Sequence, residues 1–181
     1  MPHHRLSTAS ALPLVLAFML FGCASRDPVP RTFATALLQP TAGNAAHGEV
    51  ALSVTGDVVV AKVHMEGLMP DSEHGIHVHE TGNCKSSDGS SAGGHFNPTG
   101  QPHGDPGQPH HAGDMPSVSA DAYGRVDTTI TLHDLAPDDG PYGVVGRAVV
   151  VHADPDDYHT QPAGNSGTRI SCGVVVGVKA R

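Results

Sequence analysis

Two histidines separated by one residue, His77 and His79, stand in the run GIHVHE at residues 75–80. Side chains alternate faces along a strand, so both imidazoles would lie on the same face, a few ångströms apart. Such a pair forms half of a metal site, although exposed strand histidines that bind nothing show the same spacing. The chain has 14 histidines, and further candidate ligands follow the pair: His95, His103, His110, His111, Asp114 and His152.

These candidates sort into two ligand sets. With His95 and His152 the pair makes an all-imidazole set of four, which suits copper because Cu(II) favours tetragonal nitrogen ligation. His95, His103, His111 and Asp114 lie within one loop, and three imidazoles with one carboxylate form the closed tetrahedral type of zinc site. Both sets can include His95 only if its ring binds one metal through each nitrogen.

The elements that position these ligands are expected to be short strands. Gly and Pro are abundant, at 22 and 15 residues, and only 15% of residues are charged. That composition suits strands joined by turn-rich loops and argues against a helical bundle. A strand-like pattern begins at residue 32, and alternating or β-branched runs predict strands over 48–54, 58–66, 75–80, 123–132, 144–152 and 170–178. About eight strands without an amphipathic helix predict one all-β domain, an antiparallel barrel or sandwich.

Two long segments interrupt the strand pattern, residues 83–116 and residues 153–168. Structureless loops of this length are uncommon in a compact domain unless something orders them. Both segments contain or adjoin most of the candidate ligands. A bound metal and a disulfide would give the first loop the core that it lacks.

The N-terminus has the features of an export signal. Residues 1–22 combine Arg5 with an apolar stretch of residues 12–21, too short to span a bilayer. The run LFGCA at residues 20–24 resembles a bacterial lipobox, which would place a lipid on Cys23; an ordinary signal peptide cut elsewhere is the alternative. Residues 23–31 have the composition of a flexible tether, and residues 32–181 form the predicted domain.

The remaining cysteines are consistent with export. An oxidising compartment would allow a disulfide between Cys84 and Cys172, with three free thiols as the alternative. The formal net charge of −8 argues against a nucleic acid as the binding partner. An acidic protein can still bind an anionic substrate where its site is locally positive.

Five motifs in order make the chain similar to the copper/zinc superoxide dismutases of the exported bacterial type. They are GIHVHE at 75–80, GHFNP at 94–98, HAGD at 111–114, GRAVVVH at 146–152 and GNSGTRISCG at 164–173. The resemblance covers residues 32–179, nearly the whole mature chain. It implies an eight-stranded Greek-key β-barrel or sandwich, an architecture that is immunoglobulin-like, with two long functional loops.

The resemblance also implies residue roles. His77, His79, His95 and His152 match the family's copper ligands; His95, His103, His111 and Asp114 match its zinc ligands, with one copper and one zinc per subunit. Arg169 matches the arginine that guides and docks superoxide. Apart from the resemblance, Lys85 next to Cys84 would extend its field, with a solvated surface lysine as the alternative. Cys84 and Cys172 match the intrasubunit disulfide. Asp156, in preference to Asp157, matches the carboxylate that links His77 to His103.

The expected reaction is the dismutation of superoxide to oxygen and hydrogen peroxide, with Arg169 and His95 as catalytic residues. The other classes considered are a non-enzymatic periplasmic copper/zinc-binding protein on the same fold, a zinc hydrolase and a histidine-rich structural lipoprotein. The closed zinc set opposes hydrolysis, which needs an open coordination position. We expect an envelope protein of the periplasm, membrane-anchored if Cys23 is lipidated, and a homodimer is compatible with the sequence.

Overall fold

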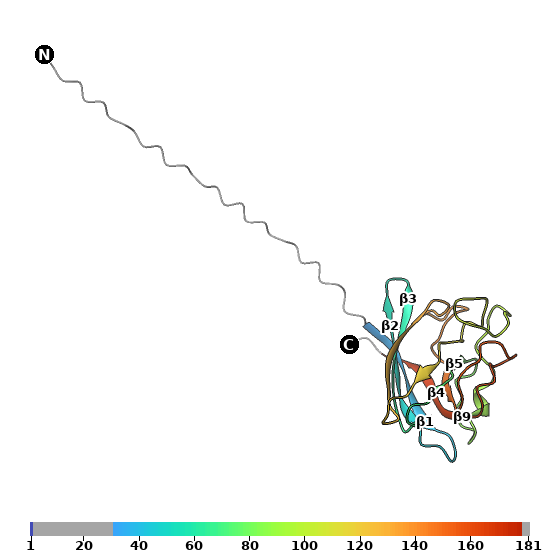
Figure 1. Ribbon diagram of the computed structural model, residues 1–181. Helices are drawn as coiled ribbons and strands as arrows, with labels where there is room; N and C mark the ends of the chain where they lie inside the picture. Colours follow the sequence, from blue (N-terminus) through green and yellow to red (C-terminus); the bar gives the residue numbers. More distant parts are fainter. Residues whose placement is uncertain (2–30, 179–181) are drawn as a thin grey trace.

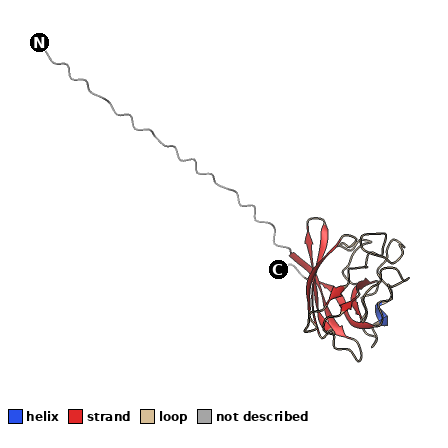
Figure 2. Ribbon diagram, viewed as in Figure 1, coloured by secondary structure: helices blue, strands red, loops and turns tan. Residues whose placement is uncertain are grey.

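The computed structural model describes Met1 and residues 31–178, and this part of the chain is all-β (Figures 1 and 2). Its strands are β1 (Arg31–Pro40), β2 (His47–Thr55), β3 (Val58–Glu66), β4 (Glu73–His74), β5 (Ile76–His79), β6 (Val118–Ser119), β7 (Val126–Leu132), β8 (Ala148–His152) and β9 (Arg169–Gly177). A short 3-10 helix, η1 (Ser90–Ala92), lies in the first long loop. The predicted signal peptide, Cys23 and most of the tether lie outside the described residues.

Seven of the strands form one curled antiparallel sheet in the order β5-β8-β9-β1-β2-β3-β7, and β4 pairs with β6. The sheet wraps around a core, while the long loops lie to one side of it (Figure 2). This arrangement confirms the predicted all-β Greek-key class. The first and last strands, β1 and β9, pair side by side from Ala34 opposite Gly177 to Pro40 opposite Ser171.

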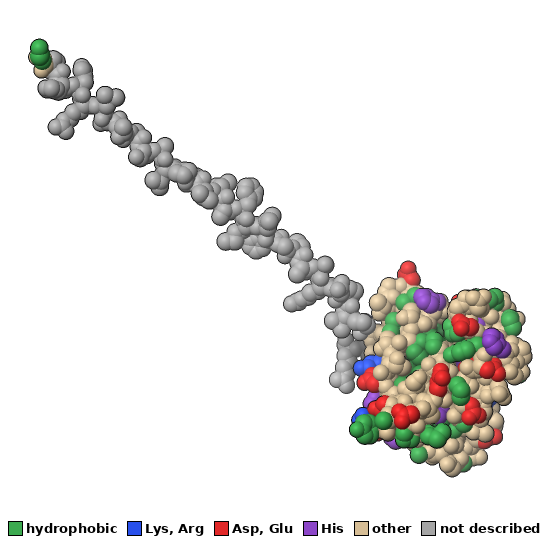
Figure 3. Space-filling view, viewed as in Figure 1, with side chains coloured by type: hydrophobic (Ala, Val, Ile, Leu, Met, Phe, Trp, Pro, Cys, Tyr) green, Lys and Arg blue, Asp and Glu red, His purple; other side chains and the backbone are tan. Residues whose placement is uncertain are grey.

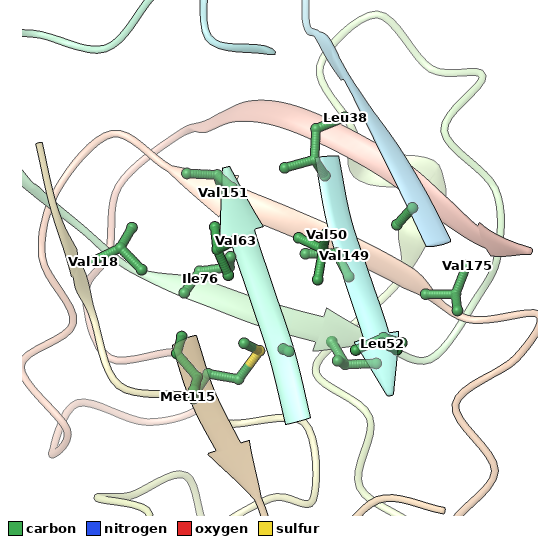
Figure 4. Packing of buried hydrophobic residues seen from close by; sticks show 14 of the residues in the cluster. Leu38, Val50, Leu52, Val63, Ile76, Met115, Val118, Val149, Val151 and Val175 are labelled. Atoms are coloured by element: carbon green, nitrogen blue, oxygen red, sulfur yellow. The ribbon is translucent and has the colours of Figure 1, made fainter. Parts of the chain in front are cut away.

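Alternation along the strands produces the core. In β3 the side chains of Val59, Ala61, Val63 and Met65 are buried and the intervening residues are not, which is the period expected of a strand with one wet face. The side chains of Leu38, Val63, Val149 and Val151 belong to one cluster of buried hydrophobic residues in the interior (Figure 4). Strand β8 is buried along its whole length because long loops cover its other face.

The predicted strand 123–132 begins only at Val126 (β7), and two further differences from the predicted strands occur at glycines. The predicted strand 75–80 is shortened to Ile76–His79, because pairing with β6 ends before Gly75 and pairing with β8 begins after it. Gly75 donates to Asp154 and accepts from His152, so it connects β5 to the second long loop. The predicted strand 144–152 begins only at Ala148, because residues 144–147 form a turn in which Gly146 has φ 83°.

The two interrupting segments are loops, as predicted. The first runs from β5 to β6 and includes η1; the second joins β8 to β9. The disulfide between Cys84 and Cys172 ties the first loop to β9, with Cα atoms 5.7 Å apart, which confirms the pairing. Among the described residues, no helix has the length and apolar character needed to cross a membrane.

Candidate metal centre

The copper set is assembled from two paired strands and a loop. His77 and His79 project to the same side of β5, and His152 ends the neighbouring β8. His95 reaches the group from the first long loop, where it forms a β-bridge with His79. The ring centroids of His77 and His95 are 4.0 Å apart. All four side chains are buried, and one nitrogen from each lies within 4.8 Å of the others.

Each of these four rings has a buried nitrogen without a hydrogen-bond partner: His77 Nδ1, His79 Nε2, His95 Nε2 and His152 Nε2. The opposite nitrogen has one: His79 Nδ1 donates to the carbonyl of Gly93 at 2.9 Å, and His77 Nε2 donates to Asp156 at 2.7 Å. A hydrogen bond on one ring nitrogen fixes the tautomer and leaves the lone pair of the other free. Four such lone pairs turned toward one point fit a copper ion.

Burial keeps three of these imidazoles neutral, those of His77, His79 and His152. It lowers the pKa of His77 from its ordinary value to about 4 and that of His152 to about 3, and the charge of neighbouring imidazoles lowers the latter further. The pKa of His79 is lowered by the same cause. Neutral rings at neutral pH offer the lone pairs that a metal requires.

The zinc set centres on one carboxylate oxygen. Asp114 Oδ1 lies 2.7 Å from His95 Nδ1, 3.1 Å from His103 Nδ1 and 3.3 Å from His111 Nδ1. Asp114 Oδ2 faces away from this group and accepts from the backbone N–H groups of Gly104 and His111. The nitrogens of His103 and His111 that face Oδ1 have no hydrogen bond, so the set fits a cation held by three imidazoles and one carboxylate.

The zinc-set carboxylate is strongly acidic. Burial alone would raise the pKa of Asp114, but the close contacts and charge of the His103 and His95 rings outweigh it, and the pKa falls well below the usual range. For His103, burial lowers the pKa, while Asp114 and Asp156 raise it to about 9. Burial lowers the pKa of His111. An ionised carboxylate among imidazoles is the charge distribution that a bound dication would complete.

His95 belongs to both sets. Its Nε2 has no partner on the copper side, and its Nδ1 contacts Asp114 on the zinc side. The copper and zinc sites predicted from the sequence are therefore both present, with one imidazole shared between them.

Asp156 connects the two sets through the ring nitrogens opposite those that face the metal sites. Its Oδ2 accepts from His77 Nε2 at 2.7 Å, and its Oδ1 accepts from His103 Nε2 at 2.9 Å. Burial would raise its pKa, but the hydrogen bonds from the two rings outweigh this and lower it below the usual range. The alternative carboxylate, Asp157, is exposed and bonds to Thr160 instead. The geometry places Asp156, and not Asp157, between the two rings.

Arg169 is the first residue of β9. Its guanidinium donates 2.7 Å hydrogen bonds to the carbonyls of Gly89 and Gly93, on either side of η1. Burial lowers its pKa from the ordinary value, and nearby Asp88 partly opposes that. Among residues 31–178, no carboxylate forms an ion pair with this guanidinium, so its charge is available to an anion.

The other histidines within residues 31–178 lie outside both sets. His74 is buried and contacts Ser72 and the carbonyl of His152, as a structural residue would. His110 lies beside Asp134 at 3.3 Å, outside the zinc group. Four more have exposed side chains: His47, His64, His133 and His159. Lys85 is also exposed.

Sequence reasoning missed the backbone groups that support the site. The carbonyl of Gly93 accepts hydrogen bonds from both His79 and Arg169. Every residue has such a carbonyl, so the sequence alone does not indicate which one supports the site. Gly164 was missed as well: it has φ 65°, and a methyl group there would overlap the carboxylate of Asp156 and the ring of His103. The sequence shows a glycine at position 164, but no neighbouring residue indicates that it packs against Asp156 and His103.

The fold and the site thus define a class: an all-β protein with a copper site and a zinc site that share an imidazole. Comparisons with known proteins agree. The protein family described as copper/zinc superoxide dismutase matches residues 46–175. "Superoxide dismutase [Cu-Zn] 2" of Aquifex aeolicus (strain VF5) is 41% identical over 134 residues, covering 71% of this chain and 78% of the relative.

Two solved structures are similar. The crystal structure of a SOD-like protein from Bacillus subtilis has a TM-score of 0.71 and 34% identity, over 77% of this chain and 95% of that one. The clock protein EA4 has a TM-score of 0.73 and 31% identity, over 82% of this chain and 96% of that one. The chain belongs to the copper/zinc superoxide dismutase family, and both ligand sets of this oxidoreductase family are intact in it.

Proposed function

We propose that the protein converts two superoxide radicals and two protons to oxygen and hydrogen peroxide, and so protects the cell envelope from external superoxide. The observation that carries this proposal is the set of unpartnered imidazole nitrogens at the copper site, next to an arginine without a carboxylate partner. A one-electron site beside a fixed positive charge is the arrangement that a small radical anion requires.

Arg169 binds and orients the substrate. Its two carbonyl contacts leave the guanidinium fixed, so little ordering is needed when an anion arrives. The overall net charge of −8 repels superoxide from the rest of the surface, and Figure 3 shows a face with more Asp and Glu than Lys and Arg side chains. The local charge of Arg169 is therefore what directs the anion to the site.

His95 supplies a proton. When bound, copper provides reversible one-electron redox chemistry and zinc provides a fixed positive charge. In the proposed cycle the Nε2 atom of His95 holds a proton between the two half-reactions and delivers it to the developing peroxide. His95 Nδ1 stays in the zinc set, so the ring keeps its orientation while Nε2 changes protonation.

The remaining residues hold the site rigid. Asp156 and the carbonyl of Gly93 orient the rings of His77 and His79, which fixes where their lone pairs point. The buried walls around the rings exclude bulk water, which strengthens each electrostatic contact.

The test is metal analysis of the purified protein alongside a superoxide dismutation assay, before and after selective copper removal. We expect activity to disappear with copper and return when copper is restored. Metal binding without dismutation would favour the alternative, a non-enzymatic copper/zinc-binding protein on this fold. Activity that survives complete copper removal would rule out the proposed cycle.

We also propose export to the periplasm with a lipid on Cys23, supported by the lipobox-like run at residues 20–24. Cell fractionation after metabolic labelling with a fatty acid tests this, because Cys23→Ser should release an unlabelled protein from the membrane fraction. Labelling that is unchanged in the variant would refute lipidation at this residue.

A homodimer is proposed from apolar side chains on neighbouring strands. Leu37 on β1 is 65% exposed, Val176 on the paired strand β9 is 59% exposed, and Val178, two residues further along, is 49% exposed. Exposed apolar groups that lie together commonly mark an interface. Sedimentation of the wild type and of Val176→Glu tests it: we expect a dimer that the variant dissociates, and a monomeric wild type would contradict the proposal.

A further inference from the structure

A surface cavity of about 460 Å³ opens beside Arg169. Its walls come from three segments, residues 41–44, 87–90 and 167–169. Two charged residues line it, the cation Arg169 and the carboxylate Asp88. The positive and negative charges that line this cavity are therefore balanced, although a net positive charge would attract an anionic substrate more strongly.

Asp88 lies close to the guanidinium without pairing with it. It directly precedes Gly89, whose carbonyl accepts a 2.7 Å hydrogen bond from Arg169 Nη1. Adding to that hydrogen bond one Cα–Cα step of about 3.8 Å and the length of an aspartate side chain puts the carboxylate within roughly 12 Å of the guanidinium. An anion bound beside Arg169 would feel the negative charge at a similar distance.

The carboxylate has a local structural role. Its Oδ1 accepts from the N–H of Ser90 at 3.0 Å at the start of η1, the segment whose flanking carbonyls hold Arg169. Hydrogen bonds from Ser90 and Ser86 lower the pKa of Asp88 to about 2, so the group is ionised at neutral pH. Asp88 thus helps to place the arginine and at the same time opposes its field.

We propose that Asp88 limits the rate at which small anions reach Arg169, by reducing the positive potential of the cavity. For superoxide this rests on the proposed function, but the electrostatic effect applies to any small anion. A unit charge about 9 Å away in water changes the local anion population by about twofold, and salt at 1 M reduces the Debye length to about 3 Å and abolishes the effect.

The test variant is Asp88→Asn, which removes the charge and keeps an oxygen to accept from Ser90. The matched control is Asp138→Asn: Asp138 Oδ1 accepts in the same way from Gly140 N–H at 3.0 Å, but Asp138 does not line the cavity. Ser87→Lys and Ser87→Asp change the charge of the same cavity wall without touching the Ser90 hydrogen bond.

Two quantities are measured on the copper- and zinc-loaded protein, kcat/KM for superoxide and the Kd for azide from an optical titration. In dilute buffer Asp88→Asn and Ser87→Lys should raise kcat/KM and tighten azide binding about twofold, and Ser87→Asp should do the reverse. These differences should vanish at 1 M salt.

The proposal is overturned if Asp88→Asn behaves like Asp138→Asn in dilute buffer, or if its gain persists at 1 M salt. Azide separates this inference from the proposed function. If the protein does not dismutate superoxide, azide affinity alone still decides the role of Asp88. If the protein dismutates superoxide and the kcat/KM and azide Kd of Asp88→Asn and Ser87→Lys equal those of the wild type, the proposed function stands and the proposed role of Asp88 is refuted.

Discussion

Asp156→Asn should weaken metal binding tenfold to a hundredfold. The side chain of Asp156 is fully buried, and its carboxylate accepts one hydrogen bond from His77 and another from His103. Asparagine keeps one acceptor but turns an NH₂ group toward the other ring, whose N–H then loses its partner. A hydrogen bond to a charged group contributes about 1.5–3 kcal/mol, and each 1.4 kcal/mol is a factor of ten. The same range is typical of losses from such outer partners of metal ligands.

The assay is zinc competition between the protein and a chromophoric chelator, which gives the zinc Kd directly. Asp157→Asn is the matched control, because it makes the same change one residue away on an exposed carboxylate that contacts Thr160 and no ring. We expect Asp157→Asn to retain the wild-type Kd. Equal losses in the two variants, or an unchanged Kd in Asp156→Asn, would refute the idea that this carboxylate orients the rings.

Three further predictions concern rate, acid and the disulfide. Arg169→Glu should lower kcat/KM by about tenfold or more while copper and zinc contents stay at wild-type levels; an unchanged rate constant would exclude the docking role. The pKa values of His77 and His152 are lowered to about 4 and 3, so between these values and 6.5 the unfolded chain binds more protons than the folded one. The unfolding free energy of metal-free protein should therefore fall as the pH falls from 6.5 to 4. His103, whose pKa is raised to about 9, acts in the opposite direction: its contribution is present below 6.5 and is lost as the pH rises through 9. Denaturant titrations between pH 4 and pH 9 test both signs. An unfolding free energy that rises on acidification from pH 6.5 to pH 4 would contradict the assignment. Replacing both disulfide cysteines with serine removes a link across 88 residues and should cost about 4–5 kcal/mol of unfolding free energy, which denaturant unfolding measures. A loss below about 1 kcal/mol would mean that the bridge adds little to the constraint on the first loop.

The ligands could be predicted from the sequence because residue type and spacing determine them. A period of two puts His77 and His79 on one side of a strand wherever that strand lies in the fold. His111 could be separated from His110 because only the former has an aspartate three residues later. The buried face of β3 was predictable for the same reason, since alternation is a local property.

What could not be predicted depends on contacts between distant backbone segments. Val144 is apolar and buried like a strand residue, but a glycine two positions later turns the chain before β8 begins. Gly75 belongs to a run that looks continuous, and only its bonds to residues 152 and 154 show why pairing changes there. Neither effect has a local sequence signal beyond the presence of glycine.

The carbonyl of Gly93 has a consequence for how this protein tolerates mutation. It accepts hydrogen bonds from a copper-set imidazole, His79, and from Arg169 at the same time, and no amino-acid replacement can delete a main-chain oxygen. Substitutions can affect it only by bending the backbone, and φ 75° together with the nearby carboxylate of Glu80 makes residue 93 poorly suited to any side chain. Mutations of residue 93 itself are therefore expected to be harmful. Side-chain substitutions elsewhere leave the two hydrogen bonds to this carbonyl in place as long as the backbone keeps its path.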